Sequence, residues 1–444
     1  MLERKITPEI CKWIQSGTNA LLIDGARQAG KTFLIRECLN RMEQDYVEIN
    51  LIEHPEMIQV LSSATSAQEL NVHLSLIANR ALDPGKTVLF IDEIQEYKEI
   101  VTKIKFLVDE GSYRYILSGS LLGVELVNLR SAPVGYLDEL TMYPLDFEEF
   151  LRASSVTDAV IDELRSCFDG RLPVSDVIHK RMMEYFRRYL VIGGMPAAVQ
   201  EYVQTGDVST VMRIQRNIIA QYKRDFTKYE AQEKRLMLIA VYNAIPTELL
   251  KQNRRFCLND IKKGLRFERA EDSFLWLEKA GVAIPVFNAT EPRVSLTQNE
   301  KSTLLKLYLN DTGLLTCLLG KATKAKILAN DAHLNCGGIY ENAVAQELCA
   351  HGYRQYYYNS HKRGELDFVI EHEGKVLPIE VKSGKDYYFH SAIEKVTHTE
   401  QYDIPEAFVL ADCNVQKKGK ITYLPVYMCM FLNEEYDLPV LTPV

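Results

Sequence analysis

The sequence predicts a multidomain α/β protein: an N-terminal parallel-sheet domain, a helical and winged-helix-like middle, and a second α/β domain at the C-terminus. Three observations predict this class. Short apolar runs alternate with amphipathic stretches over residues 1–150, the pattern is helical from 144 to about 240, and strand-like runs return after 338. Strands that alternate with helices of this length are typical of a parallel sheet. The chain has 444 residues, whereas a single core stops growing near about 250–300 residues, so we expect several domains.

The composition is that of a folded globular protein, with 47% hydrophobic and 25% charged residues. A net charge of −8 argues against general nucleic-acid affinity but leaves room for a local basic groove. No uncharged apolar stretch reaches the roughly 20 residues that cross a bilayer, so we expect no membrane partner. The nine cysteines form no Cys-x-x-Cys pair and the N-terminus lacks the apolar core of a signal peptide, which predicts reduced thiols and a cytoplasmic location.

In the N-terminal domain, four strands are expected at 20–24, 46–50, 88–92 and 113–118, with helical patterns at 31–41, 67–81 and 100–110. A glycine-rich loop follows the first strand and consists of Gly25, Ala26, Arg27, Gln28, Ala29, Gly30, Lys31 and Thr32. It fits the pattern Gly-x4-Gly-Lys-[Ser/Thr], in which backbone N–H groups converge on phosphate oxygens. Lys31 would reach the β- and γ-phosphates and the Thr32 hydroxyl would bind Mg²⁺. With Phe33, these residues are the predicted ATP-binding set; a chance glycine-rich turn is the alternative.

An acidic pair ends the apolar run 88–92. Asp92 would hold the Mg²⁺ shell as in a Walker B motif, and Glu93 would orient and deprotonate the attacking water. An exposed Asp-Glu turn is the alternative interpretation. One strand later, Ser118 stands in a Ser-Gly-Ser sequence that resembles the sensor-1 position of AAA-type ATPases, where a polar side chain helps to place the water. Simple turn chemistry is the alternative for Ser118.

The middle of the chain predicts helices that break at Gly193-Gly194-Met195-Pro196. A short helix at 258–264, a longer helix at 270–280 and strand-like runs at 282–287 and 293–296 follow. Two helices and a hairpin in this order are typical of a winged helix-turn-helix. Basic residues are mixed with several acids between 260 and 280, so we expect no strong DNA-binding stripe.

The C-terminal segment predicts a leading helix at 340–352 and strands at 355–359, 365–371, 376–382 and 406–410. In Glu380-Val-Lys382 the strand pleat points both charged side chains to one face, and Asp367 could share that face. Two carboxylates beside a lysine can bind Mg²⁺ and polarise a phosphodiester, and Glu341 on the helix would complete the metal shell. A buried structural Glu–Lys pair is the alternative.

With these residues, the chain resembles a prokaryotic family of predicted AAA-type (P-loop) ATPases. The resemblance spans almost the full length and also includes Met142–Phe150, the break at 193–196 and Asn310–Leu314. Its C-terminal part resembles the PD-(D/E)xK restriction-endonuclease fold. The expected domains are therefore a P-loop AAA-type ATPase domain at 1–150, a helical lid at 151–245, a winged helix at 246–330 and a nuclease-like domain at 331–444.

One departure concerns Gly135-Tyr136, where many members read Gly-Arg. If that arginine acts on a neighbour's γ-phosphate, its absence puts ring-type hydrolysis in doubt, and nothing in the sequence assigns the role to nearby Arg130. The main prediction is a Mg²⁺-dependent ATPase coupled to DNA binding or cleavage. The alternative is a nucleotide-dependent switch with an inactive nuclease-like domain and a protein partner or homo-oligomer. A defence effector would use the same parts.

Overall fold

The computed structural model describes residues 2–120, 135–228 and 232–434. The chain divides into two compact units. The smaller unit comprises Glu3–Tyr143 together with Glu278–Val282, and the larger unit comprises Pro144–Leu277 and the chain from Ala283 onward. None of the helices in the described ranges is both long and apolar enough to span a membrane.

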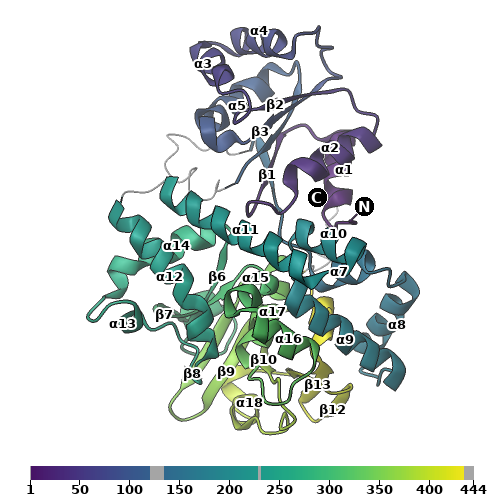
Figure 1. Cartoon of the computed structure of the whole chain (residues 1–444), viewed down its shortest axis with the longest axis vertical. Coiled ribbons are helices and arrows are strands. Elements are labelled where there is room, and N and C mark those ends of the chain that lie inside the picture. Colours follow the sequence, from purple (N-terminus) through teal and green to yellow (C-terminus); the bar gives the residue numbers. More distant parts are fainter. Residues whose placement is uncertain (1, 121–134, 229–231, 435–444) are drawn as a thin grey trace, which may run out of the picture. The chain divides into compact units, whose positions relative to one another are not determined.

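The smaller unit is built on a parallel sheet with the strand order β2-β3-β4-β1-β5 (Figure 1). Its strands are β1 Ala20–Asp24, β2 Tyr46–Asn50, β3 Val88–Asp92, β4 Arg114–Ser118 and β5 Leu137–Thr141. Its helices are α1 Thr7–Ser16, α2 Lys31–Arg41, α3 Glu56–Ser63, α4 Ala67–Ala78, the 3₁₀ helix η1 Ile94–Tyr97 and α5 Glu99–Glu110. The four expected strands are confirmed to within one residue. Strand β5 was not predicted because it is a half-exposed edge strand with two acidic residues.

The strand register places several polar residues at one edge of this sheet. Strand β3 is buried along its whole length, and apolar clusters lie on both faces of the sheet. Asn50 pairs with Asp92 across β2 and β3, and Ser118 pairs with Ile23 across β4 and β1. Because the carboxyl ends of parallel strands share an edge, the last residues of these strands lie close together.

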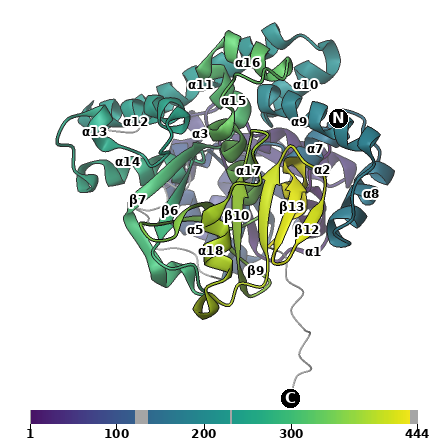
Figure 2. The same cartoon turned by 90° about the horizontal axis from the view of Figure 1, so that it is seen from below.

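The larger unit combines a helical region with a mixed sheet in the order β12-β13-β11-β10-β9-β8-β6-β7. The helices are α7 Phe147–Ala153, α8 Asp158–Asp169, α9 Asp176–Ile192, α10 Pro196–Thr205, α11 Val208–Lys228, α12 Gln232–Leu250, α13 Leu258–Ile261, α14 Phe267–Lys279, α15 Thr312–Leu319, α16 Lys321–Leu328, α17 Gly337–Ala350 and α18 Ser391–Thr397. The strands are β6 Ala283–Ala289, β7 Glu300–Leu309, β8 Tyr356–Ser360, β9 Gly364–His372, β10 Lys375–Val381, β11 Ala407–Ala411, β12 Gln416–Lys418 and β13 Ile421–Pro425. Figure 2 shows β9 beside β10 with α17 next to β10, and β13 farther along the same sheet beyond β11.

The hairpin expected after the middle helices is present, but its second strand begins later in the chain than predicted. The run 293–296 is not a strand: Pro292 precedes it, Ser295 has φ 58°, and a 3₁₀ helix follows at Leu296–Asn299. The second strand of the hairpin is β7, which begins at Glu300. Strand β6 pairs with β7 on one side and with β8 on the other. The hairpin therefore belongs to the same sheet as the C-terminal strands.

Three of the motifs shared with the resembled family meet at one junction in the larger unit. The Leu145 N–H donates to the Gly194 carbonyl at 2.7 Å, and the Gly194 N–H donates to Asp311 Oδ2 at 2.5 Å. A Cβ on Gly194 would lie 2.0 Å from the Leu145 carbonyl oxygen, and a Cβ on Gly313 would lie 2.4 Å from the Ile192 carbonyl oxygen. The glycines of these motifs thus allow backbone segments to touch directly.

Candidate functional site

The glycine-rich loop connects β1 to α2 and has the conformation that its sequence requires. Gly25 has φ 127°, and a Cβ there would lie 2.2 Å from the Met142 carbonyl oxygen. Gln28 and Gly30 also have positive φ values, of 66° and 97°. Gly30 caps α2 without a side chain that could accept from the first helical N–H groups. Those donors are therefore free to bind an anion.

Lys31 is the first residue of α2 and is buried. Its Nζ donates to the carbonyl oxygens of Gly25 and Ala26, both at 2.9 Å. Burial lowers the pKa of the Lys31 amino group to about 8, against the attraction of Glu93, Asp24 and Asp92. The amino group therefore lies inside the loop, where a phosphate would replace the two carbonyl partners.

Asp92 lies at the centre of a hydrogen-bonded group at the edge of the sheet. The Thr32 hydroxyl donates to its Oδ2 at 2.8 Å, and the Ser118 hydroxyl donates to its Oδ1. The Asn50 amide also reaches Oδ2, at 3.4 Å. Burial raises the pKa of Asp92, opposed by its hydrogen bonds from Ser118 and Thr32. A hydroxyl and a carboxylate in contact are hard oxygen donors, which fit a Mg²⁺ ion.

Glu93 turns the chain sharply after β3. Its backbone has φ 58° and ψ 43°, a conformation that is uncommon for residues other than glycine. Its N–H donates to Asp92 Oδ1 at 3.0 Å, and the Gln95 side chain donates to its carboxylate. Left-handed residues cluster at functional sites because the surrounding structure must hold them. Glu93 thus lies directly beside the predicted metal ligand.

Sequence reasoning missed Asp24, Asn50 and Gln95 in this region. Asp24 ends β1 immediately before the loop; burial raises its pKa, opposed by a hydrogen bond from Thr141 and the charge of Lys31. The signal for Asp24 and Asn50 was present in the sequence, because each is a polar residue at the end of a strand in a parallel sheet. Gln95 had no such signal, since it lies on the 3₁₀ helix η1 that the sequence pattern did not predict.

Two predicted features of the nucleotide site have less support from geometry. The Phe33 side chain is exposed, and no contact assigns it a role. At the position where the resembled family has arginine, Lys105 Nζ lies 5.3 Å from the centre of the Tyr136 ring. Arg130 lies outside the described residues.

The four predicted C-terminal residues lie together in the larger unit. Glu341 is on α17, Asp367 on β9 and Glu380 on β10, and all three are buried. Lys382 Nζ lies 2.7 Å from Glu380 Oε1, and Asp367 Oδ2 accepts from the Val381 N–H at 2.9 Å. Burial, followed by the charge of Asp367, raises the pKa of Glu380 to about 7.

Two cations that the sequence analysis did not include lie among these carboxylates. Lys306 on β7 is fully buried, with Nζ 2.9 Å from Glu365 Oε1, 3.4 Å from Asp367 Oδ1 and 3.7 Å from Glu341 Oε2. Arg254, which follows α12, forms an ion pair with Glu341 and lies 3.9 Å from Asp367 Oδ1. Lys306 had a signal in the sequence, because it interrupts the apolar run Leu304–Leu309. Arg254 had none, since it stands in a polar segment.

The cations divide the carboxylates into two classes. Burial, followed by the charge of Asp367, raises the pKa of Glu341 to about 8. Burial also acts to raise the pKa of Asp367, but Lys306 and Arg254 outweigh it and hold the pKa below its usual value. Of the two carboxyl groups, Glu341 is therefore the more easily protonated and Asp367 the more strongly held in its ionised form.

The predicted second Mg²⁺ site does not have the expected geometry. Among the described residues, the only three acidic or imidazole side chains whose ligand atoms all lie within 4.8 Å of one another are Asp146, Glu347 and His351. These three already make local contacts: His351 binds Asp146 Oδ2 and the Leu432 carbonyl oxygen, and Glu347 accepts from the N–H at the start of α7. Glu341, Asp367 and Glu380 do not converge on one point in this way.

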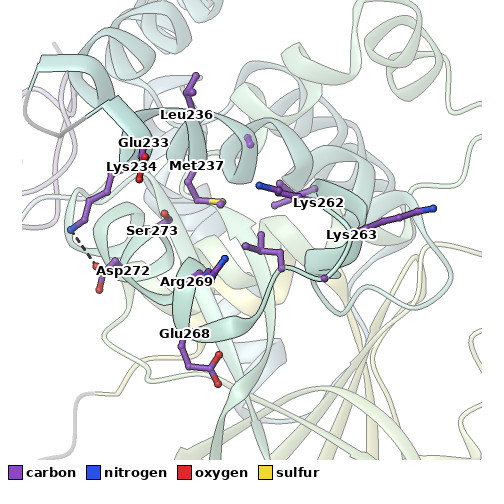
Figure 3. A pocket seen from close by; sticks show the side chains of 14 residues that line it. Glu233, Lys234, Leu236, Met237, Lys262, Lys263, Glu268, Arg269, Asp272 and Ser273 are labelled. Atoms are coloured by element: carbon purple, nitrogen blue, oxygen red, sulfur yellow. Dashed lines mark ion pairs between the residues drawn. The ribbon is translucent and has the colours of Figure 1, made fainter.

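A surface pocket of about 840 Å³ lies between α12, α13 and α14, where the segment expected to form a winged helix meets the end of the expected helical lid (Figure 3). Lys234 and Asp272 form a 3.2 Å ion pair across it. Its charged lining residues are Glu233, Lys234, Lys262, Lys263, Glu268, Arg269 and Asp272. Acidic and basic side chains alternate here, so the pocket has no continuous basic stripe for a phosphate backbone.

Three family models match separate parts of the chain. Residues 17–151 match an AAA domain, residues 183–325 match a domain of unknown function (DUF8612), and residues 336–428 match another domain of unknown function (DUF4143). No curated protein matches the chain. The first match covers the whole sheet and the glycine-rich loop, and residues 17–151 are therefore an AAA-type ATPase domain with a P-loop that binds nucleotide.

Solved structures are similar to the chain only at a low level. The Walker-type ATPase PABY2304 of Pyrococcus abyssi is 15% identical, with 72% of this chain and 96% of that chain covered and a TM-score of 0.46. Thermotoga maritima RuvB, a Holliday junction branch migration motor, is 14% identical, with 69% and 92% covered and a TM-score of 0.30. Drosophila ORC bound to DNA is 14% identical, with 65% and 86% covered and a TM-score of 0.26. Likeness at this level supports no conclusion about what this chain binds.

Proposed function

We propose that the AAA-type domain binds ATP and hydrolyses it with Mg²⁺. The observation that carries this proposal is the contact between Thr32 and Asp92 beside a preshaped glycine-rich loop. In P-loop ATPases a hydroxyl and an acidic residue in these positions share the metal ion of the nucleotide. The Ser118 hydroxyl and the Glu93 N–H both donate to Oδ1 of the same carboxylate, so both residues lie beside the expected metal ion, where residues that act on the attacking water are needed.

Each residue has a defined role in this proposal. The N–H groups at the start of α2 and the Lys31 amino group bind the phosphates, and Lys31 gives up its loop carbonyls to do so. Mg²⁺ held by Thr32 and Asp92 would neutralise charge on the β- and γ-phosphate oxygens. Glu93 accepts the proton of the attacking water, and Ser118 helps to position that water. The absence of an arginine at 136 means that any charge stabilisation from arginine comes from another position.

Two substitutions test the proposal. Lys31→Ala should reduce ATP binding by at least about tenfold, because the buried cation that contacts the phosphates is lost. Glu93→Gln should still bind ATP but lower turnover by about a hundredfold or more, because the amide cannot accept the proton. Equilibrium binding of a fluorescent ATP analogue and steady-state phosphate release measure the two effects. Lys86→Ala, at an exposed lysine of the same domain, is the control. Unchanged binding and turnover in Lys31→Ala would rule out the assignment.

A second candidate function is Mg²⁺-dependent cleavage of DNA by the larger unit. The observation that favours it is that Asp367 and Glu380 lie on the adjacent strands β9 and β10, with Lys382 directly after β10, which supports the proposed nuclease-like fold. Linear, branched and single-stranded DNA should be incubated with Mg²⁺ or Mn²⁺, with and without ATP. Cleavage that is lost in both Asp367→Ala and Lys382→Ala would establish this function. If no substrate is cleaved while ATP is hydrolysed, the result favours the nucleotide-dependent switch over the nuclease.

A further inference from the structure

In the carboxylate cluster of the larger unit, protein side chains already supply positive charge beside the acidic groups. Its four carboxyl groups belong to Glu341, Glu365, Asp367 and Glu380, and its three cations to Arg254, Lys306 and Lys382. The cations come from three different segments of the chain, and each lies within 4 Å of at least one carboxylate oxygen. The formal charge of the cluster is therefore close to balanced by protein groups alone.

Few carboxylate oxygens in the cluster remain for a metal ion. Both oxygens of Glu341 have partners, since Arg254 pairs with Oε1 and the Tyr308 hydroxyl donates to Oε2 at 2.9 Å. Both oxygens of Asp367 also have partners, Lys306 on Oδ1 and the Val381 N–H on Oδ2. Of the carboxylate oxygens in the cluster, Glu380 Oε2 is the one that is buried without a hydrogen-bond partner among the described residues. A Mg²⁺ or Mn²⁺ ion bound through Glu341 or Asp367 would therefore compete with protein groups for the same oxygens.

A metal ion that entered this cluster would also meet electrostatic repulsion. A divalent cation added to the group would reverse the sign of its formal charge in a buried environment, where unpaired charge is costly. The Arg254 guanidinium would have to move before a metal ion could bind. It contacts Glu341 and approaches Asp367, the two carboxylates that the metal ion would bridge.

The position of Arg254 is supported by the fold around it. Arg254 lies in the short segment between α12 and α13, and its guanidinium passes over the first residue of α17. A Cβ on Gly337 would lie 2.2 Å from Arg254 Nη2, so any side chain at 337 would push the guanidinium away. Arg254 is one-fifth exposed, whereas Lys306 is fully buried on the central part of β7. Arg254 can therefore be removed without opening the core, and unlike Lys382, which is also partly exposed, it contacts both Glu341 and Asp367.

We infer that Arg254 takes the place of a divalent cation in the Glu341–Asp367–Glu380 cluster, so that the native chain binds no Mg²⁺ or Mn²⁺ there. The cluster becomes a metal site only when the guanidinium is removed. In the native chain the same residues act as a buried ionic clamp that joins α17, β7, β9 and β10 to the segment after α12. This inference concerns the larger unit alone and does not depend on ATP hydrolysis in the AAA-type domain. It is incompatible with the second candidate function, so metal-dependent cleavage that is lost in Asp367→Ala would also contradict it.

The test is a count of bound Mn²⁺ by electron paramagnetic resonance on the full, nucleotide-free chain. The native chain and Asp367→Asn should bind the same number of Mn²⁺ ions, because any ion counted in both lies elsewhere. Arg254→Met should bind one Mn²⁺ more, and adding Asp367→Asn to it should remove that ion. Arg255→Met, at the neighbouring arginine outside the cluster, should match the native chain.

Two outcomes would overturn the inference. One is a Mn²⁺ ion on the native chain that Asp367→Asn loses, because the metal would then bind with Arg254 in place. The other is no additional Mn²⁺ on Arg254→Met, because the guanidinium would then not be what excludes the metal. If Arg254→Met does not fold, as judged by circular dichroism, Arg254→Gln keeps a hydrogen bond to Glu341 without the charge and should show the same additional ion.

Discussion

At the scale of single residues, Lys31 shows how burial prepares a side chain for a ligand. Its amino group is enclosed by the glycine-rich loop, and its hydrogen-bond partners among the described residues are two carbonyl oxygens, which a bound phosphate would replace. Burial with neutral partners disfavours the charged form. The nucleotide-free site therefore holds a lysine that titrates within the experimental pH range, and phosphate binding should restore its usual basicity.

We predict that ATP affinity falls as the pH rises above about 8, the pKa to which burial lowers the Lys31 amino group. The protonated amine binds phosphate, so above that pH binding requires uptake of a proton and weakens by up to about tenfold per pH unit. Titration with a fluorescent ATP analogue across a pH series measures this. Lys31→Arg keeps its charge over that range and should bind with a weaker dependence on pH; an equally steep fall in this variant would assign the effect to another group.

A second prediction at this scale concerns Glu341. Burial raises its pKa from 4.5 to about 8, so the folded chain holds the Glu341 proton more tightly than the unfolded chain. The stability that comes from this difference is complete below pH 4.5 and is lost as the pH rises through about 8. Glu380 acts in the same direction up to about pH 7. Glu341→Gln should therefore gain stability relative to the native chain as the pH rises over this window. Urea unfolding at several pH values measures it, and a difference that stays constant with pH would contradict the assignment.

At the scale of elements, the junction of α7, α9 and α15 explains motifs that have no place in the nucleotide site. The segment after β5, the break between α9 and α10 and the start of α15 are far apart in the sequence, yet their backbones are in direct contact. Asp311 connects two of them, since it caps α15 by accepting from the Leu314 N–H and also accepts from the Gly194 N–H. These motifs therefore hold the helical region together.

We predict that Gly194→Ala destabilises the larger unit by about 1–3 kcal/mol, the usual cost of overpacking a close contact. The added Cβ would lie 2.0 Å from the Leu145 carbonyl oxygen, so the backbone must move. Gly384→Ala is the matched control, because no atom lies within 4 Å of a Cβ at that position. The midpoint of urea unfolding compares the two variants; equal midpoints would mean that the junction adapts without cost.

At the scale of the whole molecule, the two compact units have separate cores. The smaller unit has apolar clusters on the two faces of its parallel sheet, and the larger unit has its own cluster against the mixed sheet. Units with separate cores can unfold in separate transitions. A ligand that binds one folded unit stabilises that unit by mass action.

We therefore predict two unfolding transitions in calorimetry. A slowly hydrolysed ATP analogue with Mg²⁺ should raise the midpoint temperature of one of them. At a ligand concentration about a hundred times Kd the stabilisation is about 2.7 kcal/mol. Lys31→Ala should lose this shift while keeping both transitions. A shift of both transitions by the same amount would show instead that the two units unfold together.

Most of the AAA-type domain could be predicted from the sequence. The glycine-rich loop is contiguous, so its spacing alone specifies a backbone shape, and Asp92, Glu93 and Ser118 follow strands whose ends must share an edge. The four predicted C-terminal strands match β8 to β11 to within one residue, whereas β12 and β13 were not predicted. Asp367, Glu380 and Lys382 lie near one another as expected, and their role stays a prediction. The half-exposed strand β5 and the start of β7 were missed, because an edge strand and a proline-interrupted turn have weak periodicity.

What the sequence by itself determined is therefore local: the phosphate loop, the order of strands and helices, and the charges that interrupt apolar strands. The tertiary structure alone decided which opposite charges meet. Arg254 and Glu341 are 87 residues apart, and Lys306 and Asp367 are 61 residues apart. The energy of a buried ion pair depends on distance through space and on burial, and neither quantity can be obtained from spacing along the chain. For this reason the sequence predicted a metal site where the fold places an arginine and a lysine.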